Sequence, residues 1–120
     1  MTLKENPLSK KSYEFALTIV TLYKEFSSLK KEYVLSKQLL RSGTSIGANV
    51  AEANGAISKR DFSAKISIAY KESLETKYWL SLLRDSDYLD KNKANTIIES
   101  PYELSRIMFS ILKSTRIDKQ

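Results

Sequence analysis

The stretch Arg41-Ser-Gly-Thr-Ser-Ile-Gly-Ala-Asn-Val-Ala-Glu-Ala-Asn-Gly-Ala56 holds all three glycines of the 120-residue chain. Small residues recur in it at steps of four, which on a helix places them in one bare ridge. Each helical glycine costs about 1 kcal/mol relative to alanine, and close packing of another helix can offset that cost. The spacing therefore predicts a packing ridge on a long helix, although the Ser-Gly-Thr-Ser segment is also compatible with a loop.

Apolar residues continue through this stretch at spacings of three and four, which favours a helix over a loop. The helix predicted from them covers about residues 33–57. Its expected partner is a helix over about 59–86, whose heptad pattern carries small residues near its middle. We expect these small residues to face the ridge and to let the two axes approach closely. The predicted packing motif consists of Gly43, Ile46, Gly47, Val50, Ala51, Gly55, Ala69, Ser73 and Thr76.

A first helix is predicted over about residues 7–26. It opens at Asn6-Pro7, because asparagine caps helices and proline is tolerated at the first helical position. Its apolar arc is wider than the roughly 100° that one neighbouring surface needs. We therefore expect contacts with two neighbours, one of them in another subunit; deep burial within a monomer is the alternative. The candidate oligomer interface consists of Phe15, Ile19, Leu22 and Phe26.

A fourth helix is predicted over about residues 91–117, with Asp90 as its cap. Pro101 lies inside it. Proline removes one backbone hydrogen bond and disfavours helical geometry in the residue before it. We therefore expect a kink or a break near Ser100. Together the segments predict an all-α fold in a single domain spanning residues 1–120, an up-down-up-down four-helix bundle.

Composition excludes several classes of chemistry. The chain has no cysteine and no histidine, which removes disulfides, thiolate or imidazole metal sites and histidine-based catalysis. Glu52, Glu72 and Glu75 suggest a carboxylate pocket, but pairing with Arg41 or a neighbouring lysine is the interpretation we favour. We expect no cofactor, no metal and no catalytic residue, hence no enzyme. Without a signal-peptide pattern or a membrane-length apolar run, we expect a cytoplasmic protein with no membrane role.

The net charge of +6 is uneven. Residues 1–60 hold ten Lys or Arg and five Asp or Glu, a net of +5, and the remainder is nearly neutral. Such a surplus attracts phosphate backbones or acidic partners, and otherwise forms a solvated face. Lys59 and Arg60 are placed in the first turn of a helix, where the helix dipole disfavours cations. This placement suggests that they bind an anion from outside the chain. The candidate nucleic-acid-binding residues are Lys10, Lys11, Lys30, Lys31, Lys37, Arg41, Lys59, Arg60 and Lys65.

Three segments carry a family resemblance. They are residues 38–53, residues 58–66, which begin with Ser-Lys-Arg-Asp-Phe, and residues 71–80. A further match lies near the start of the chain, at Asn6-Pro7 and Tyr13-Glu14-Phe15-Ala16. With these motifs the sequence resembles bacterial four-helix-bundle proteins encoded by intervening sequences in 23S ribosomal RNA genes. The fourth helix matches that family only in its apolar pattern.

The resemblance implies an antiparallel four-helix bundle that assembles into a homopentameric ring. One relative, the accessory variability protein of diversity-generating retroelements, uses a basic pentamer to bind nucleic acid and a reverse transcriptase. Most members have no established function, and the shared motifs lie on helix packing rather than on an active site. The resemblance thus implies possible nucleic-acid and protein partners but no catalytic residue.

The functional hypothesis is a non-enzymatic, oligomeric helical scaffold that binds RNA or DNA through phosphates with little sequence specificity. The alternative is a protein-interaction adaptor, in which the wide apolar arc of the first helix recruits partners and the charge has no nucleic-acid role.

Overall fold

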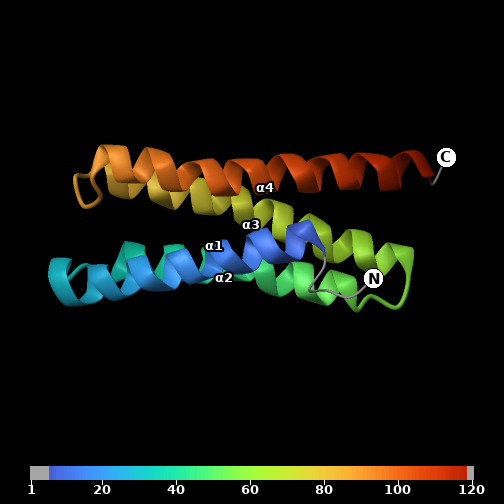
Figure 1. The fold of residues 1–120 in the computed structure, drawn as a ribbon, viewed down its shortest axis with the longest axis horizontal. Helices are drawn as coiled ribbons and strands as arrows, with labels where there is room; N and C mark the ends of the chain where they lie inside the picture. The colour runs from blue at the N-terminus through green and yellow to red at the C-terminus, as the bar shows by residue number, and fades with distance from the viewer. Residues whose placement is uncertain (1–5, 119–120) are drawn as a thin grey trace.

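The computed structural model describes residues 6–118, which form four long helices and no strand. The molecule is elongated, with extents of 49 × 23 × 21 Å, and the chain reverses its direction along the long axis at each connection (Figure 1). The all-α prediction is confirmed. The helices are α1 (Pro7–Glu25), α2 (Val34–Asn54), α3 (Lys59–Asp85) and α4 (Lys91–Asp118), with a π-helical segment η2 (Phe26–Lys30) after α1.

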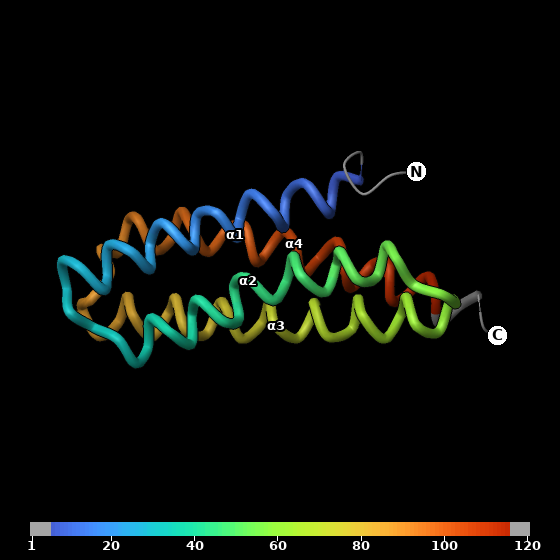
Figure 2. Tube along the Cα trace, turned by 90° about the horizontal axis from the view of Figure 1, so that it is seen from below, coloured from blue at the N-terminus to red at the C-terminus, as the bar shows by residue number. Residues whose placement is uncertain are grey.

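The helices are not packed equally. α2 contacts both α1 and α3 extensively, and α3 also packs along α4, whereas α1 and α4 touch over a shorter stretch (Figure 2). The core between them is apolar and contains few polar groups, among them the hydroxyls of Ser42 and Thr76. The predicted pairing of the second and third helices is therefore the largest contact in the chain.

The start of α1 follows the prediction. The Asn6 side chain accepts a hydrogen bond from the Leu8 amide at 2.9 Å, and Pro7 occupies the first helical position. Between the first two predicted helices, the helical backbone continues as the π-helical turn η2, and Lys31 then adopts a left-handed conformation with φ of 52°. This residue ends the helical backbone, because a single left-handed residue reverses the path of the chain.

The small-residue ridge is helical, as predicted, but its partner is α1 rather than α3. A Cβ atom on Gly43 would lie 2.9 Å from Ile19 Cγ1, and one on Gly47 would lie 3.3 Å from the Ser12 carbonyl oxygen. α3 meets the adjacent face of α2, where the hydroxyls of Ser42 and Thr76 are 3.0 Å apart. Neighbouring residues on a helix point about 100° apart, so Ser42 and Gly43 serve two different helices.

The packing motif is also shorter than predicted. α2 ends at Asn54, and Gly55 follows it as the C-terminal cap, where a Cβ atom would meet nothing closer than the Glu52 carbonyl oxygen at 3.7 Å. Ala51 is exposed. These two residues therefore do not pack between helices. The motif members that the structure buries are Gly43, Ile46, Val50, Ala69, Ser73 and Thr76, with Gly47 half-buried.

The four residues expected at an oligomer interface lie in the core of the chain itself. Their side chains are between 0% and 4% exposed, so the interface prediction is wrong for these four residues. The exposed apolar residues of α1 are instead Tyr13 and Leu17, at 65% and 53% exposure. The four residues that lie in the core instead of at an interface are Phe15, Ile19, Leu22 and Phe26.

The predicted cap of α4 is confirmed, and α3 is capped in the same way. Ser58 Oγ accepts from the Asp61 amide at 3.0 Å, and Asp90 Oδ2 accepts from the Lys93 amide at 3.1 Å. Of the predicted kink or break near Ser100, the break is wrong, because α4 continues through Pro101 as one helix. The proline ring is buried on the core face of α4, and this packing offsets the hydrogen bond that proline removes.

Replacing Gly43 with alanine tests the close contact between α1 and α2. The new methyl group would press on Ile19, a fully buried and β-branched side chain that has little room to move. We expect a net loss on the order of 1 kcal/mol in the free energy of unfolding, even though alanine improves helix propensity by a similar amount. Urea denaturation measures the difference.

Gly55→Ala is the matched control, since the added methyl group there has free space. We expect it to change the free energy of unfolding by no more than about 0.5 kcal/mol. If Gly43→Ala were as stable as Gly55→Ala, the tight contact with Ile19 would be refuted.

Candidate nucleic-acid interface

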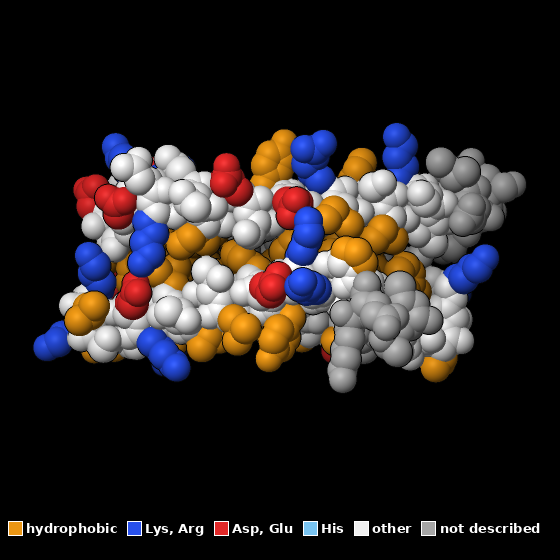
Figure 3. Space-filling model, viewed as in Figure 1, with side chains coloured by type: hydrophobic (Ala, Val, Ile, Leu, Met, Phe, Trp, Pro, Cys, Tyr) orange, Lys and Arg blue, Asp and Glu red, His pale blue; other side chains and the backbone are white. Residues whose placement is uncertain are grey.

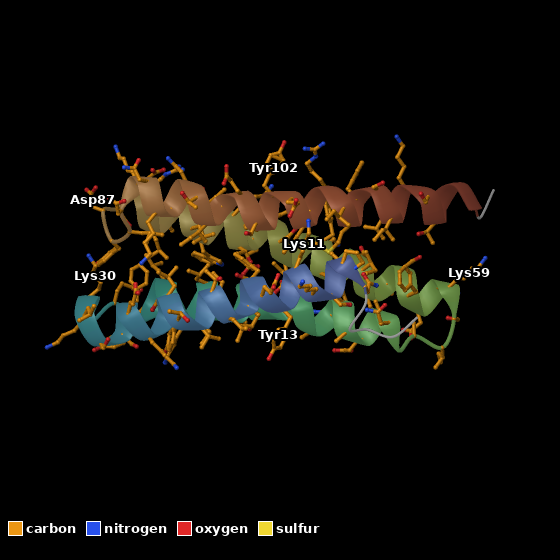
Figure 4. The ribbon with its side chains drawn as sticks, in the orientation of Figure 1. Lys11, Tyr13, Lys30, Lys59, Asp87 and Tyr102 are labelled. Carbon is orange, nitrogen blue, oxygen red and sulfur yellow. The ribbon has the colours of Figure 1, made fainter. Side chains whose placement is uncertain are left out.

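The predicted basic residues do not form one continuous face. Lys30 and Lys59 lie at opposite ends of the long axis, with Lys11 between them (Figure 4). Figure 3 likewise shows lysine and arginine side chains distributed over the visible face rather than gathered in one patch. The reason is topological, since residues 30 and 59 follow helices that each span most of the molecule's length.

One basic group lies at the start of α3. Lys59 and Arg60 occupy its first turn, directly after the capping Ser58, and both are exposed. Among the described residues, neither forms an ion pair. The helix dipole disfavours cations here by up to about 1 kcal/mol each, so an anion from outside the chain would relieve an unfavourable arrangement.

A second basic group lies at the other end of the molecule. Lys30 and Lys31 end the helical backbone after α1, Lys37 lies in the first turns of α2, and all three are exposed. Across residues 6–115 none of the three has a carboxylate partner at ion-pairing distance. Their charges are therefore as available to an external anion as those of Lys59 and Arg60.

Glu32 lies within this second group, and its charge is used locally. Its carboxylate accepts hydrogen bonds from the amides of Val34 (3.0 Å), Leu35 (3.0 Å) and Ser36 (2.7 Å). Burial raises the pKa of Glu32, but the hydrogen bonds from these amides outweigh burial and lower the pKa below its ordinary value of 4.5. The carboxylate thereby stabilises the start of α2, a role that the sequence analysis did not identify.

Three other predicted basic residues pair with carboxylates on a neighbouring helix, and Arg41 is the first of them. Arg41 pairs with Glu72 at 3.0 Å and also with Glu75, which connects α2 to α3. Trp79 Nε1 donates to the same Glu75 carboxylate at 2.9 Å. The interpretation of these glutamates as structural partners is thus confirmed, and Arg41 serves the bundle rather than an open basic surface.

Lys65 and Lys11 are paired as well. Lys65 lies 3.0 Å from Glu52, and the hydrogen bond from this partner, with its charge, raises the pKa of Lys65. Lys11 on α1 lies 3.1 Å from Glu103 on α4. Lys93 and Glu25 form a second α1–α4 pair at 2.9 Å. These pairs are partly exposed, so solvent screens them and each adds little to the stability of the bundle.

Lys10, the last candidate, borders an apolar depression. This depression has a volume of about 740 Å³ and lies between α1 and α2. Tyr13 and Leu17 line it from α1, and Gly47 and Ala51 line it from α2. Because its lining is largely apolar, it suits a protein surface better than a phosphate.

The described residues contain no cluster of histidine, cysteine or carboxylate side chains that could hold a metal ion. Within the same part of the chain, no helix combines the length and apolar character needed to cross a bilayer.

A comparison with protein families decides the identity of the fold. The family described as 23S rRNA-intervening sequence protein matches residues 4–110, which is most of the sequence. The chain belongs to this family. A 1.70 Å crystal structure of an S23 ribosomal protein family member from Bacteroides thetaiotaomicron, described as a protein with unknown function, is similar to this 23S rRNA-intervening sequence protein.

The two structures agree closely, with a TM-score of 0.87 and 47% sequence identity over 88% of this chain and 98% of the other. No curated protein matches the sequence. The family resemblance seen in the sequence is therefore confirmed. The matched structure shows the same fold, and its description assigns no activity.

The outward face of α4 was not predicted from the sequence to hold functional residues. Tyr102, Arg106 and Phe109 lie there, all exposed. Their spacing of four and three residues, which places them on one side of a helix, was the available signal.

Glu32→Ala tests the role of the carboxylate that precedes α2. The variant leaves three amides without their acceptor, and we expect a loss of about 1 kcal/mol in the free energy of unfolding at neutral pH. Because the folded-state pKa is lowered, this contribution is complete above the unfolded pKa of about 4.5 and is lost as pH falls through the folded-state pKa. The gap between wild type and variant should therefore narrow below pH 4.5.

Glu14→Ala removes an exposed carboxylate from α1 and serves as the control. Urea titrations of all three proteins across acidic pH measure the effect. A constant gap between wild type and Glu32→Ala down to strongly acidic pH would contradict the assigned role.

Proposed function

We propose that this 23S rRNA-intervening sequence protein is a non-enzymatic, oligomeric scaffold that acts in the cytoplasm and binds RNA or DNA with little sequence specificity. The observation that carries the proposal is the pair Lys59 and Arg60, exposed in the first turn of α3 and without a carboxylate partner among the described residues. Lys30, Lys31 and Lys37 offer a second group of the same kind at the opposite end. Contacts of this type are made to phosphates and carry no base readout.

The net charge of +6 supports the same function. Of the nine candidate basic residues, Lys11, Arg41 and Lys65 are committed to carboxylates. The remaining six carry the surplus charge outward, and a surplus of this sign raises the local concentration of polyanions and speeds their association. They are Lys10, Lys30, Lys31, Lys37, Lys59 and Arg60.

The proposal includes an assembly: an antiparallel four-helix bundle in a homopentameric ring, the arrangement that the family resemblance implies. The exposed Tyr13 and Leu17, beside the apolar depression between α1 and α2, are the surface on this chain that best suits a subunit contact. A ring would repeat each basic group several times, and such multivalency raises the affinity for a long polyanion without any new kind of contact.

The double variant Lys59→Gln/Arg60→Gln tests the binding surface. Each lost phosphate contact removes about one released counterion, so the slope of log affinity against log salt should become shallower by about two. Affinity should fall alike for oligonucleotides of unrelated sequence. Fluorescence anisotropy with labelled RNA and DNA at several salt concentrations measures both quantities.

The control Lys71→Gln/Lys91→Gln lowers the net charge by the same amount, but at exposed lysines of α3 and α4 that belong to neither basic group. We expect it to retain most of the wild-type affinity. Equal binding by wild type and the Lys59/Arg60 variant at low salt would exclude this site.

Leu17→Glu tests the assembly. A charge on this exposed apolar residue should lower the mass measured by light scattering, because its burial against a second copy would become costly. Ser110→Glu, which places the same charge at an exposed position of α4, is the control and should leave the mass unchanged.

The apolar depression is also the observation that favours the alternative function, a protein-interaction adaptor. Capture of a specific protein partner after nuclease treatment, together with no salt-dependent nucleic-acid binding by wild type, would favour the adaptor. The Leu17→Glu variant should then lose that partner.

A further inference from the structure

Aromatic and basic side chains alternate along the outward face of α4. Tyr102, Arg106, Phe109 and Lys113 follow one another at steps of four, three and four residues, which places them in one line on the helix. Tyr102 and Phe109 are 50% and 53% exposed, and both basic residues are exposed. Figure 3 shows hydrophobic and basic groups alternating along the edge of the molecule formed by α4, and Figure 4 labels Tyr102 at this edge. We name these four residues the α4 stripe.

Side chains of α3 and α4 lie against the two rings. Lys77 Nζ lies 5.2 Å from the centroid of the Tyr102 ring, and Arg106 Cζ lies 5.8 Å from the same centroid. The Tyr70 ring packs against Phe109 with centroids 5.9 Å apart and an interplanar angle of 41°. Each aromatic ring of the stripe therefore has a fixed neighbour, which reduces the entropy that the ring would lose on binding a ligand.

The electrostatic surroundings of the stripe are positive. Residues 104–113 include no aspartate or glutamate. Glu103 is paired with Lys11 at 3.1 Å, and Glu99 lies one turn before Tyr102, at the start of the stripe. On the neighbouring part of α3, Glu72 and Glu75 are paired with Arg41. The cations beside the rings are thus left to face an external anion.

We propose that the α4 stripe binds single-stranded nucleic acid, with bases stacking on Tyr102 and Phe109 and phosphates contacting Lys77, Arg106 and Lys113. This inference rests on the proposed function, because it names the form of nucleic acid that the scaffold binds. Proteins that bind single strands without sequence preference combine aromatic rings, on which bases stack, with cations that follow the backbone. The stripe has both components.

The spacing of the rings fits such a strand. Seven residues of α-helix separate Tyr102 from Phe109, which is about 10 Å along the axis. Stacked nucleotides advance about 3.4 Å each along one strand, so the rings are about three nucleotides apart. The faces of the bases are accessible only in a single strand, since in a duplex they are covered by neighbouring base pairs. A duplex would meet only the cations.

Exposed aromatic residues are also common at protein interfaces. A protein partner would need to supply carboxylates between apolar contacts to match the cations of the stripe. A single strand supplies anionic groups and flat rings together at every nucleotide. Charge complementarity therefore favours the nucleic acid, and a protein contact is an outcome that the experiment distinguishes.

The double variant Tyr102→Ala/Phe109→Ala tests the proposal. Affinity for a 15-nucleotide oligo(dT) should fall about tenfold or more, because each ring that stacks on a base contributes several-fold or more to affinity. Affinity for a duplex of the same length should stay within about twofold, since the phosphate contacts remain. Fluorescence anisotropy with the full chain measures both. Because the two rings are half-exposed, thermal unfolding of the variant should stay close to that of wild type.

The control Tyr102→Phe/Phe109→Tyr keeps both rings and should bind oligo(dT) like wild type. A second variant, Arg106→Gln/Lys113→Gln, should weaken single-strand binding and make the salt slope shallower by about two. The pattern expected from the proposal is selective loss of single strands with the alanine variant and retention with the ring-swapped control.

Three results would overturn the inference, and they are distinguishable from one another. If the alanine variant binds oligo(dT) like wild type while Lys59→Gln/Arg60→Gln is weakened, the stripe has no role and the proposed function stands. If the alanine variant changes the mass measured by light scattering but not the affinity, the stripe is a protein contact. If wild type binds neither single strands nor duplex, the proposed function fails and the inference fails with it.

Discussion

The close contact of α1 with α2 at Gly43 is the constraint on which the rest of the bundle depends. The buried Ile19 side chain fills the space that a Cβ atom would occupy, and one turn later the Ser12 carbonyl approaches Gly47. With α1 so close on one side, α2 presents its adjacent face, including Ser42, to α3. α2 therefore contacts both neighbours extensively, and α4 joins the bundle mainly through α3. The exposed faces of α1 and α4 follow from this order of packing.

Charged groups divide into two kinds in this arrangement. Some join two helices in ion pairs, as Arg41 does with Glu72 and Lys11 with Glu103. Lys59 and Arg60 are placed at a helix end, where the described residues provide no partner. The distinction explains why counting basic residues in the sequence overstates the open basic surface.

Much of the fold is predictable from local signals. Ser58 with Asp61 marks the start of α3, and Asp90 marks the start of α4, because a capping side chain acts on amides within three residues of itself. Choosing the partner of the glycine ridge was not possible in this way. Periodicity shows which residues share a face, but Ser42 and Gly43 lie only about 100° apart, and the identity of the neighbour depends on how all four helices pack.

The candidate site was predictable to a similar degree. The exposure of Lys59 and Arg60 follows from their place in a first turn, whereas their separation from Lys30 follows from the length of the helices between them. The continuation of the helical backbone through η2 also escaped prediction, since the polar sequence Ser27-Ser28 is equally typical of a loop. The spacing of the exposed residues on α4 could be read from the sequence. Their contacts with Tyr70 and Lys77 of α3 could not, because they depend on how α3 and α4 pack.

The contact between Gly43 and Ile19 also sets an order on sequence change. A larger residue at position 43 presses on the isoleucine at position 19, and a smaller residue at position 19 opens the space that this larger residue needs. The two positions are therefore epistatic: each change alone lowers stability, and the two together should cost less than the sum of the single changes.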